Sequence, residues 1–522
     1  MEIDRKTTIL LCLIFIVGAF FYLYRLDSRV LWEDESITAN LAVNILKYGI
    51  PMGDDGKNRL VFNSPGDINK ENVWVYSPWL SEYITAVSFA IFGKNEFAAR
   101  LPFAVLGFLS VVFLFYVVWD IFKDRRMALI ALLLLVTSEI LILHSRQCKY
   151  YAIAVFMQVL FIYGFYMVLK RKRPGIVFIV IALTCQFYSN YMFVPGNLLL
   201  LLFAGLVFRK KYPGVFYDVI MAAMIVSVFA LIWVIYAHLW VQFVNTGTGY
   251  YHYYSKFLFY LMEINMAMFP LLLLLLLVYF RKSDFVVVND VSKDMIFFIL
   301  VMIPFQIVFI INFPIIFTRY IIVLVPAFIV LQSLILRKTP PLLRYMVLGI
   351  LCFTNLIGYV GLYSFKPVRT ITPTIEVQLL RITLMNIFVE RISPYVNRTE
   401  EVIAFLNENT QPGQSLLVSG YETEFPVIFY TQLKVLNPQY VKSQNIEMPD
   451  WIFPQTVSGS YSQSVLSPYL APYSNFMKQN YDIVIIEVHK SSGIGSIPEP
   501  YLYEYFTPRR KIPFIAFKKK TL

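Results

Sequence analysis

The sequence predicts a polytopic α-helical membrane protein that ends in a soluble α/β domain. Its 522 residues are 58% hydrophobic and 17% aromatic, and only 15% are charged. The mean hydropathy is +0.63, and soluble domains contain a much smaller apolar fraction. Apolar runs of membrane-spanning length recur from residue 7 to residue 362, whereas residues 398–522 alternate short apolar runs with polar ones.

The charge distribution favours a membrane protein over a nucleic-acid-binding one. A formal net charge of +12 suits either class. The Lys and Arg residues lie between apolar segments, so membrane lipid, and no nucleic acid, is the predicted partner. Cys12, Cys148, Cys185 and Cys352 are scattered in or beside apolar stretches, without a CxxC or Cys/His cluster. Neither a zinc site nor a disulfide scaffold is indicated, and no metal or other cofactor is predicted.

The first apolar run, roughly Thr7 to Tyr24, is predicted to remain as a signal anchor. It is long enough to span a bilayer, and no small-residue cleavage site follows it. Arg5 and Lys6 precede the run and place the N-terminus in the cytoplasm. The first outer loop and its interfacial helices are then expected to occupy residues 25–100.

Ten further apolar runs bring the predicted number of spans to about eleven. They lie near Leu101–Phe122, Met127–Leu143, Tyr151–Leu169, Ile176–Tyr191, Val194–Phe208, Phe216–Trp240, Phe257–Phe280, Met295–Phe313, Tyr320–Leu336 and Tyr345–Leu362. This arrangement puts every strongly basic short loop on the cytoplasmic side, as the positive-inside bias requires. These loops are Lys123–Arg126, Lys170–Arg173, Arg209–Lys211, Arg281–Lys282 and Arg337–Lys338.

The apolar segment Tyr76–Gly93 is predicted to lie in the membrane interface rather than to cross the bilayer. Ser81, Glu82, Thr85 and Ser88 fall on one face of a helix over this segment, which is an amphipathic pattern. If the segment crossed, all five basic loops would lie outside, against the positive-inside bias.

The polypeptide after the last span is predicted to stay on the outer side. Residues 1–365 form the predicted membrane domain, 366–397 a linker, and 398–522 an extracytoplasmic α/β domain. Thr399 caps a helix that stops at Pro412-Gly413, and Glu424–Gln432 is predicted to be a second helix. Three predicted strands begin at Ser415, Asp482 and Pro513, and the second is expected to be buried. No phosphate loop or dinucleotide fingerprint occurs, so the domain is expected to support the membrane part or contact an acceptor.

Consecutive acids follow the first span in Leu31-Trp32-Glu33-Asp34-Glu35. A carboxylate held at a membrane boundary can take a proton from a hydroxyl or bind a cation. The alternative is that these are ordinary solvated loop acids.

Several cations are expected at outer ends of spans, where basic residues are otherwise scarce. Arg146 and Lys149 lie three residues apart and share one face if the helix continues, so they are predicted to grip one phosphate. Their alternative role is to snorkel to lipid headgroups. Arg100 and Arg319 are isolated cations in similar positions, and either is a candidate ligand or a simple anchor.

Aromatic residues gather on the same predicted face. Tyr188 and Tyr191 are candidates for lining a sugar pocket, although an interfacial aromatic belt also explains them. His252 lies among tyrosines, where an interfacial residue is more common than a metal ligand.

The order of these motifs resembles the GT-C fold of polytopic glycosyltransferases. The acidic pair Asp34-Glu35 is followed by Tyr76-Ser-Pro-Trp, Phe97-Ala-Ala-Arg100-Leu-Pro, Ser145-Arg-Gln-Cys-Lys-Tyr-Tyr-Ala and Thr318-Arg-Tyr-Ile-Ile-Val-Leu-Val-Pro. Within that fold the chain is most similar to the protein O-mannosyltransferase and lipid A aminoarabinose transferase branch, which is glycosyltransferase family 39-like. The resemblance covers residues 8–365 and, in architecture, the α/β domain.

The resemblance implies an inverting glycosyltransferase that uses a polyprenyl-phosphate sugar as donor. Asp34 falls on the family's catalytic carboxylate, and Glu35 lies next to it. Arg100, Arg146 and Lys149 match the family's functional basic positions. The aminoarabinose branch carries an acid after the basic pair, where this chain has Tyr150.

The sequence therefore predicts a hexosyl- or pentosyltransferase of the cell envelope with its site at the outer face of the plasma or inner membrane. Catalysis is assigned to Asp34 and Glu35. Substrate binding is assigned to Arg100, Arg146, Lys149, Tyr150, Tyr191 and Arg319. The acceptor hydroxyl could belong to a protein, a lipid or a polysaccharide. Two other classes remain open: a flippase or transporter of a lipid-linked or anionic solute, and a structural membrane subunit that presents the C-terminal domain.

Overall fold

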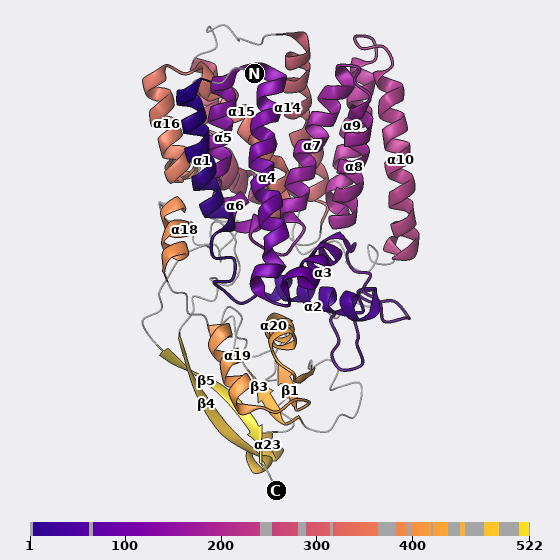
Figure 1. Ribbon diagram of the computed structural model, residues 1–522, viewed down its shortest axis with the longest axis vertical. Helices are drawn as coiled ribbons and strands as arrows, with labels where there is room; N and C mark the ends of the chain where they lie inside the picture. Colours follow the sequence, from indigo (N-terminus) through magenta and orange to yellow (C-terminus); the bar gives the residue numbers. More distant parts are fainter. Residues whose placement is uncertain are drawn as a thin grey trace.

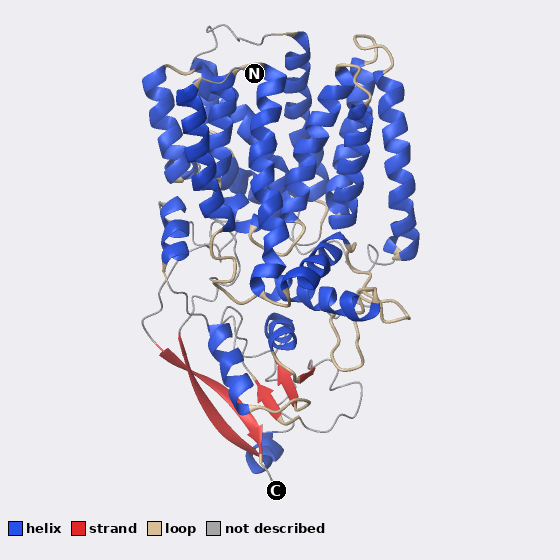
Figure 2. Cartoon of the chain, viewed as in Figure 1, coloured by secondary structure: helices blue, strands red, loops and turns tan. Residues whose placement is uncertain are grey.

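A helical bundle and a smaller sheet domain lie at opposite ends of the molecule, and the N-terminus is at the far end of the bundle from the sheet (Figure 1). The computed structural model describes residues 4–61, 66–240, 253–279, 289–313, 317–363, 383–393, 398–418, 421–436, 449–454, 474–489 and 511–520. Helices account for the bundle and all strands belong to the smaller domain (Figure 2). The chain is a multi-pass integral membrane protein.

Six helical segments of the described residues are long and apolar enough to cross a bilayer. They are α4 (Glu96–Phe122), α7 (Tyr151–Leu169), α9 with the turn before it (Tyr191–Phe208), α10 (Val215–Tyr236), α14 (Asp290–Ile310) and α15 with the turn before it (Thr318–Lys338). A bent pair adds a seventh if it is one span, and shorter apolar helices include α1 (Arg5–Leu23), α8 (Pro174–Ser189) and α16 (Pro341–Phe353). Several of the roughly eleven spans predicted from the sequence are therefore short or broken helices in the structure.

Three predicted spans are interrupted. They contain α5 (Arg125–Val136) with α6 (Glu139–Ser145), bent by 57°; α12 (Tyr253–Glu263) with a π segment (Ile264–Met268) and α13 (Leu273–Tyr279); and α16 with α17 (Leu356–Tyr363). The hydroxyls of Thr137 and Thr354 donate to carbonyls one turn earlier, so backbone groups at two breaks keep partners. A cavity of about 80 Å³ lies where the three breaks meet. Irregular backbone inside a membrane is tolerated where it lines such a cavity.

Ion pairs join the basic loops at the N-terminal end of the bundle. Asp4 pairs with Arg125 at 2.7 Å, and Asp124 of the same α4–α5 loop pairs with Arg337 at 2.6 Å. The pairs Arg171–Asp218 and Lys211–Asp294 connect the remaining described basic loops to neighbouring helices. Arg281-Lys282 lies outside the described residues. The described basic loops thus gather at the end away from the sheet domain (Figure 1).

Two short helices lie across the other end of the bundle, α2 (Glu33–Tyr48) and α3 (Leu80–Phe92) (Figure 1). The polar face of α3 points inward, not toward solvent, since Ser81, Glu82, Thr85 and Ser88 are all buried. Thr85 and Ser88 donate their hydroxyls to backbone carbonyls, which lowers the cost of that burial. The opposite face is apolar and open, with Val87 61% and Ile91 67% exposed.

The C-terminal sheet has the strand order β2-β1-β3-β5-β4. β1 (Ser415–Val418) is parallel to β2 (Lys434–Leu436) and to β3 (Trp451–Phe453), whereas β5 (Lys511–Lys519) is antiparallel to β3 and to β4 (Tyr481–His489). The prediction that the strand at Asp482 is buried is wrong. β4 lies at the sheet edge with β5 as its sole neighbour in the described sheet, so Ile483 and Ile485 are 66% and 61% exposed.

Helix α20 (Tyr421–Tyr430) joins this domain to the membrane part. The Asn40 amide on α2 donates to the Phe425 carbonyl, and the Leu31 N–H donates to the Tyr430 hydroxyl. The Val30 N–H donates to Glu400 on α19 (Arg398–Asn409). These bonds fix the chain immediately before α2 and part of α2 itself.

The segment predicted as a linker contains a helix, α18 (Thr383–Ile392). Glu390 of this helix pairs with Arg29 at 2.6 Å and with Arg391 at 2.9 Å. The Arg25 guanidinium donates to the Arg391 carbonyl at 3.0 Å. The helix is therefore attached to the loop that follows α1. The remaining linker residues, 366–382 and 394–397, lie outside the described residues.

Candidate active site

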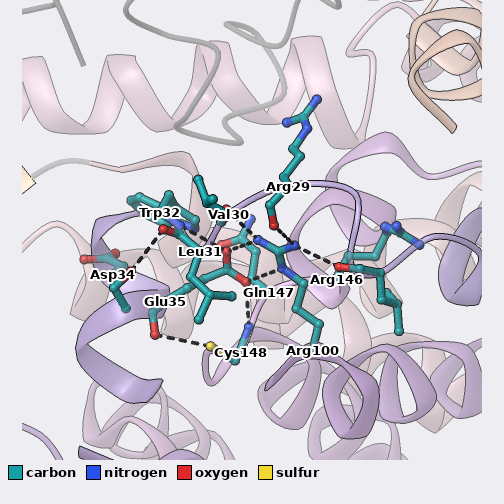
Figure 3. A network of polar contacts seen from close by, with 12 residues as sticks. Arg29, Val30, Leu31, Trp32, Asp34, Glu35, Arg100, Arg146, Gln147 and Cys148 are labelled. Atoms are coloured by element: carbon teal, nitrogen blue, oxygen red, sulfur yellow. Dashed lines mark hydrogen bonds and ion pairs between the residues drawn. The ribbon is translucent and has the colours of Figure 1, made fainter. Parts of the chain in front are cut away.

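The acidic stretch forms the first turn of α2, not a loop. Trp32 is the N-cap, and Glu33, Asp34 and Glu35 all lie in the first turn, where carboxylates interact favourably with the helix dipole. The Glu35 carboxylate accepts a hydrogen bond from the Trp32 N–H at 3.4 Å, which supports the helix start. Figure 3 shows the Asp34 side chain turned away from that of Glu35. The two acids are consequently in different environments.

Glu35 forms a buried, two-pronged ion pair with Arg100 on α4. The Arg100 Nε donates to Oε1 at 2.8 Å and Nη2 donates to Oε2 at 2.6 Å, and the Glu35 side chain is 1% exposed. The Cys148 N–H also donates to Oε1 at 3.1 Å (Figure 3). With its oxygens engaged by protein groups, Glu35 is placed to hold the structure together. This geometry disagrees with the predicted catalytic role.

Arg100 is held as completely as its partner. Beyond Glu35, its guanidinium donates to the carbonyls of Leu26, Arg29 and Val30 at 2.8 to 3.1 Å. It therefore fixes the loop between α1 and α2, which has no regular structure of its own. The predicted direct contact with substrate does not fit this arrangement, because the donors already face backbone acceptors.

Asp34 forms an ion pair with Arg319, which lies far from it in the sequence. The Arg319 Nη1 lies 3.3 Å from the Asp34 Oδ2, and the side chains are 10% and 18% exposed, respectively. The guanidinium also lies over the rings of Phe317, at 3.8 Å, and Trp32, at 5.6 Å. A cation over aromatic faces keeps its charge while losing water. Of the predicted pair of acids, Asp34 is the one that remains partly open.

A short 3₁₀ helix, η3 (Thr318–Leu324), delivers Arg319 to this position. The Thr318 hydroxyl donates to the Glu263 carboxylate at 2.6 Å, and both residues are buried. Glu263 stands at the end of α12 next to the π segment. This bond ties the beginning of η3 to one of the interrupted spans.

Two tyrosines, Tyr150 and Tyr76, lie within electrostatic range of Asp34. Tyr150 is within electrostatic range of Asp34, Arg319 and Tyr320. Tyr76 is within range of Asp34, Tyr320 and Tyr191. Phenolic hydroxyls next to a carboxylate and a guanidinium can bind the hydroxyl groups of a sugar. The predicted residues Asp34, Tyr150 and Arg319 are thus brought together, and Tyr191 lies within range of Tyr76.

Arg146 and Lys149 do not share a helical face. Helix α6 ends at Ser145, and Arg146 is its C-cap. The Arg146 guanidinium donates to the carbonyls of Tyr22, at 3.0 Å, and Arg25, at 2.8 Å, at the end of α1. The predicted phosphate grip by Arg146 is inconsistent with this geometry, because the side chain is buried and caps a helix C-terminus.

Lys149 has a different environment. Its side chain is partly exposed, and its charge acts on Glu82 of α3 and on the neighbouring Cys148. Among the described residues its ammonium makes no hydrogen bond or ion pair. It adjoins Tyr150, which faces the Asp34–Arg319 pair. Of the two predicted phosphate ligands, Lys149 is the one available to a ligand.

Tyr76, Tyr320, Trp32 and Glu82 are not among the site residues predicted from the sequence. Tyr76 and Tyr320 stand inside two of the motifs that carry the resemblance, so their position next to Pro78 and Arg319 was the available signal. Glu82 was predicted only as part of the polar face of an amphipathic interfacial helix. No three His, Cys, Asp or Glu side chains of the described part gather closely enough to hold a metal ion, and His252 lies outside that part.

Replacing Arg146 with Ala is expected to destabilise the protein by about 1.5 to 3 kcal/mol. The substitution leaves carbonyls at the end of α1 without their charged donor. Thermal unfolding of the purified protein measures this loss, with Lys149→Ala as the matched control that should unfold close to wild type. A stable Arg146→Ala variant that binds a phosphate ligand poorly would contradict the capping role.

Comparison with known proteins adds to this geometry. Residues 77–235 match the family model described as dolichyl-phosphate-mannose-protein mannosyltransferase. The chain superimposes on the crystal structure of ArnT from Cupriavidus metallidurans in the apo state with a TM-score of 0.58 and 12% sequence identity, over 98% of each chain. The chain has the GT-C fold.

A second ArnT structure and a curated relative extend the comparison. ArnT from Cupriavidus metallidurans bound to undecaprenyl phosphate matches with a TM-score of 0.56 and 12% identity, over 99% of this chain and 98% of that one. An uncharacterized protein from Aquifex aeolicus is 28% identical over 162 residues, which cover 31% of this chain. That alignment spans 30% of the relative's length. The GT-C resemblance seen in the motifs therefore extends to the three-dimensional arrangement of nearly the whole chain.

Proposed function

We propose that this GT-C protein is an inverting glycosyltransferase that moves a sugar from a polyprenyl phosphate to an acceptor hydroxyl. The observation that carries the proposal is the partly open Asp34–Arg319 pair among tyrosines on this fold. Undecaprenyl phosphate, the ligand of the similar ArnT structure, has the chemistry expected of the leaving group. A carboxylate for the acceptor proton and cations for the phosphate are the groups that this reaction requires.

In the proposed reaction, the donor phosphate binds Arg319 and Lys149. Phosphate then competes with Asp34 for the guanidinium, and a carboxylate that loses a cationic partner becomes a better proton acceptor. Asp34 takes the proton of the acceptor hydroxyl as its oxygen forms the new bond to the anomeric carbon. The bond from that carbon to the phosphate oxygen breaks, and the polyprenyl phosphate leaves with the electron pair. Cations at the phosphate stabilise the charge that develops there.

The other predicted site residues are proposed to position this centre. Glu35 and Arg100 hold the loop and the first turn that carry Asp34. Arg146 holds the end of α1. Tyr150 and Tyr191, together with Tyr76, are proposed to contact the sugar.

A direct test is the release of polyprenyl phosphate by the purified protein in lipid nanodiscs. The assay combines a panel of short-chain polyprenyl-phosphate hexoses and pentoses with a membrane extract that supplies acceptors. Release of polyprenyl phosphate from the sugar-carrying donors supports the proposal. A flippase would move the lipid between leaflets without cleaving it, and a structural subunit would do neither, so intact donor at the end of the assay overturns the proposal.

The proposed orientation places the N-terminus in the cytoplasm and the C-terminal domain outside, with about eleven spans in residues 1–365. The segment 366–397 connects these spans to an outer domain formed by residues 398–522. The gathering of the described basic loops at one end supports this orientation.

Cysteine labelling in intact cells is expected to confirm the orientation. In a variant without native cysteines, a membrane-impermeant maleimide should label Glu408→Cys at the exposed end of α19. Lys172→Cys in the exposed α7–α8 loop is the matched control and should react only after the membrane is opened. The reverse pattern would contradict the proposed orientation.

A further inference from the structure

Glu82 is a buried carboxyl close to the proposed donor site. It lies in the first turn of α3 and is 3% exposed. Its Oε2 atom has no hydrogen-bond partner among the described residues. A carboxylate in that position is shielded from water and keeps one unbonded oxygen, so the neutral form is favoured even though the Glu82 backbone N–H donates to the group. Burial raises the pKa of Glu82 to about 7, with the Lys149 charge acting in the opposite direction.

The other described charged groups near Glu82 have partners elsewhere, so Lys149 is the electrostatic partner of Glu82. Helix α3 packs against α2, α4 and α8. On α2 and α4, Asp34 is paired with Arg319 and Glu35 with Arg100.

The other ionisable groups on these helices are Tyr83 on α3 itself, Glu33, Lys47 and Tyr48 on α2, Glu96, Tyr116 and Asp120 on α4, and Cys185 and Tyr188 on α8. Cys148, in the turn between α6 and α7, also interacts with Glu82. Among the residues that the structure describes, Lys149 in that turn is the cation whose charge acts on Glu82.

The state of Glu82 decides how much of the Lys149 charge is available to a ligand. An ionised Glu82 attracts the ammonium and competes with an incoming phosphate. A neutral Glu82 leaves the ammonium to the phosphate. Conversely, a bound phosphate next to Lys149 disfavours negative charge on Glu82, so ligand binding and proton binding support each other.

We propose that Glu82 is the proton-binding partner of Lys149, and that an anionic lipid phosphate binds together with a proton on this side chain. The inference rests on the proposed function, because it assigns the donor phosphate to Lys149. It makes Glu82 a positioning residue that acts through Lys149. It also gives α3 a reason to point its polar face inward.

The experiment measures binding of a ligand whose own charge does not change with pH. The methyl ester of a short-chain polyprenyl phosphate is a phosphodiester, so it carries one negative charge throughout the range used. Wild-type protein in nanodiscs should bind it up to roughly tenfold more tightly at about pH 6 than at about pH 8, the limit when binding requires one proton on a group with a pKa of about 7. Calorimetry near pH 7 in two buffers of different ionisation enthalpy should show proton uptake.

The Glu82→Gln variant should bind at both pH values as wild type binds at the lower one, without proton uptake. Glu96→Gln, a partly exposed acid in the first turn of neighbouring α4, is the matched control and should keep the wild-type pH dependence. The calorimetric measurement needs no variant, so it remains decisive if Glu82→Gln does not fold.

Binding without proton uptake, or an unchanged pH dependence in Glu82→Gln, would overturn the role of Glu82 and leave the proposed function intact. No binding of the phosphodiester at either pH by folded wild-type protein would overturn the proposed donor site, and this inference with it.

Discussion

The Asp34→Asn variant is expected to transfer sugar about two to four orders of magnitude more slowly than wild type, the usual loss when a general base is removed. Asparagine has nearly the size of aspartate but cannot accept the acceptor's proton. The proposed phosphate ligands Arg319 and Lys149 remain, and Arg319 also loses the carboxylate with which a phosphate would compete. Donor affinity should therefore be maintained or increased while kcat falls.

Steady-state transfer and donor binding must be measured on the same preparations. Glu33→Gln is the matched control, because it removes a charge from the same helical turn without touching the Arg319 pair. It should retain activity within about a factor of two, and both variants should unfold near the wild-type temperature. Wild-type turnover by Asp34→Asn would exclude Asp34 as the base. Equal losses in the two variants would point to a general charge effect.

Breaking the Glu35–Arg100 pair is expected to be the most destabilising single change in the loop region. Removing one partner of a buried ion pair typically costs about 3 to 5 kcal/mol, because the other charge remains buried without compensation. Arg100→Met should be worse than Glu35→Gln, since it also leaves the carbonyls of Leu26, Arg29 and Val30 without their donor. Unfolding in detergent, followed by a calorimetric or fluorescence midpoint, measures the loss.

A double-mutant cycle separates the pair from its surroundings. The Glu35→Gln/Arg100→Met double variant removes both charges, so it should be less destabilised than the sum of the single variants. Arg125→Met is the control for losing an arginine from an exposed pair, because Asp4 and Arg125 have side chains 58% and 35% exposed. It should cost far less than either change at the buried pair, because solvent screens an exposed ion pair. Additive single effects at Glu35 and Arg100 would show that the ion pair is not the source of the loss.

Hydropathy was sufficient for the spans that are regular throughout. The predicted limits Tyr151–Leu169 and Val194–Phe208 coincide with α7 and α9. It did not predict the break between α5 and α6, because the polar run Thr137-Ser138-Glu139 is short and lies between two strongly apolar stretches. A break of this kind depends on tertiary partners, such as the cavity at which three interrupted spans meet.

The sequence did not indicate the ion-pair partners of Asp34 and Glu35. The sequence order placed Asp34 and Glu35 side by side, while the rotation of α2 sends one to Arg319 and the other to Arg100. Likewise, the spacing of Arg146 and Lys149 indicated a shared helical face, but α6 ends before it reaches them. Arg146, and not Lys149, donates to backbone carbonyls because it reaches the end of α1, which is more than a hundred positions away in the chain.

Hydrogen bonds from α20 and α19 to α2 and the residues just before it mean that the C-terminal domain helps to hold the Asp34 carboxylate in position. Just before the acidic turn, Leu31 is hydrogen-bonded to Tyr430 and Val30 to Glu400. Within α2, Asn40 is hydrogen-bonded to Phe425. A nanobody that separates α20 from α2 would loosen the first turn of α2, which carries Asp34, without entering the site. Inhibition of that kind is non-competitive with the lipid donor, and more donor would not relieve it.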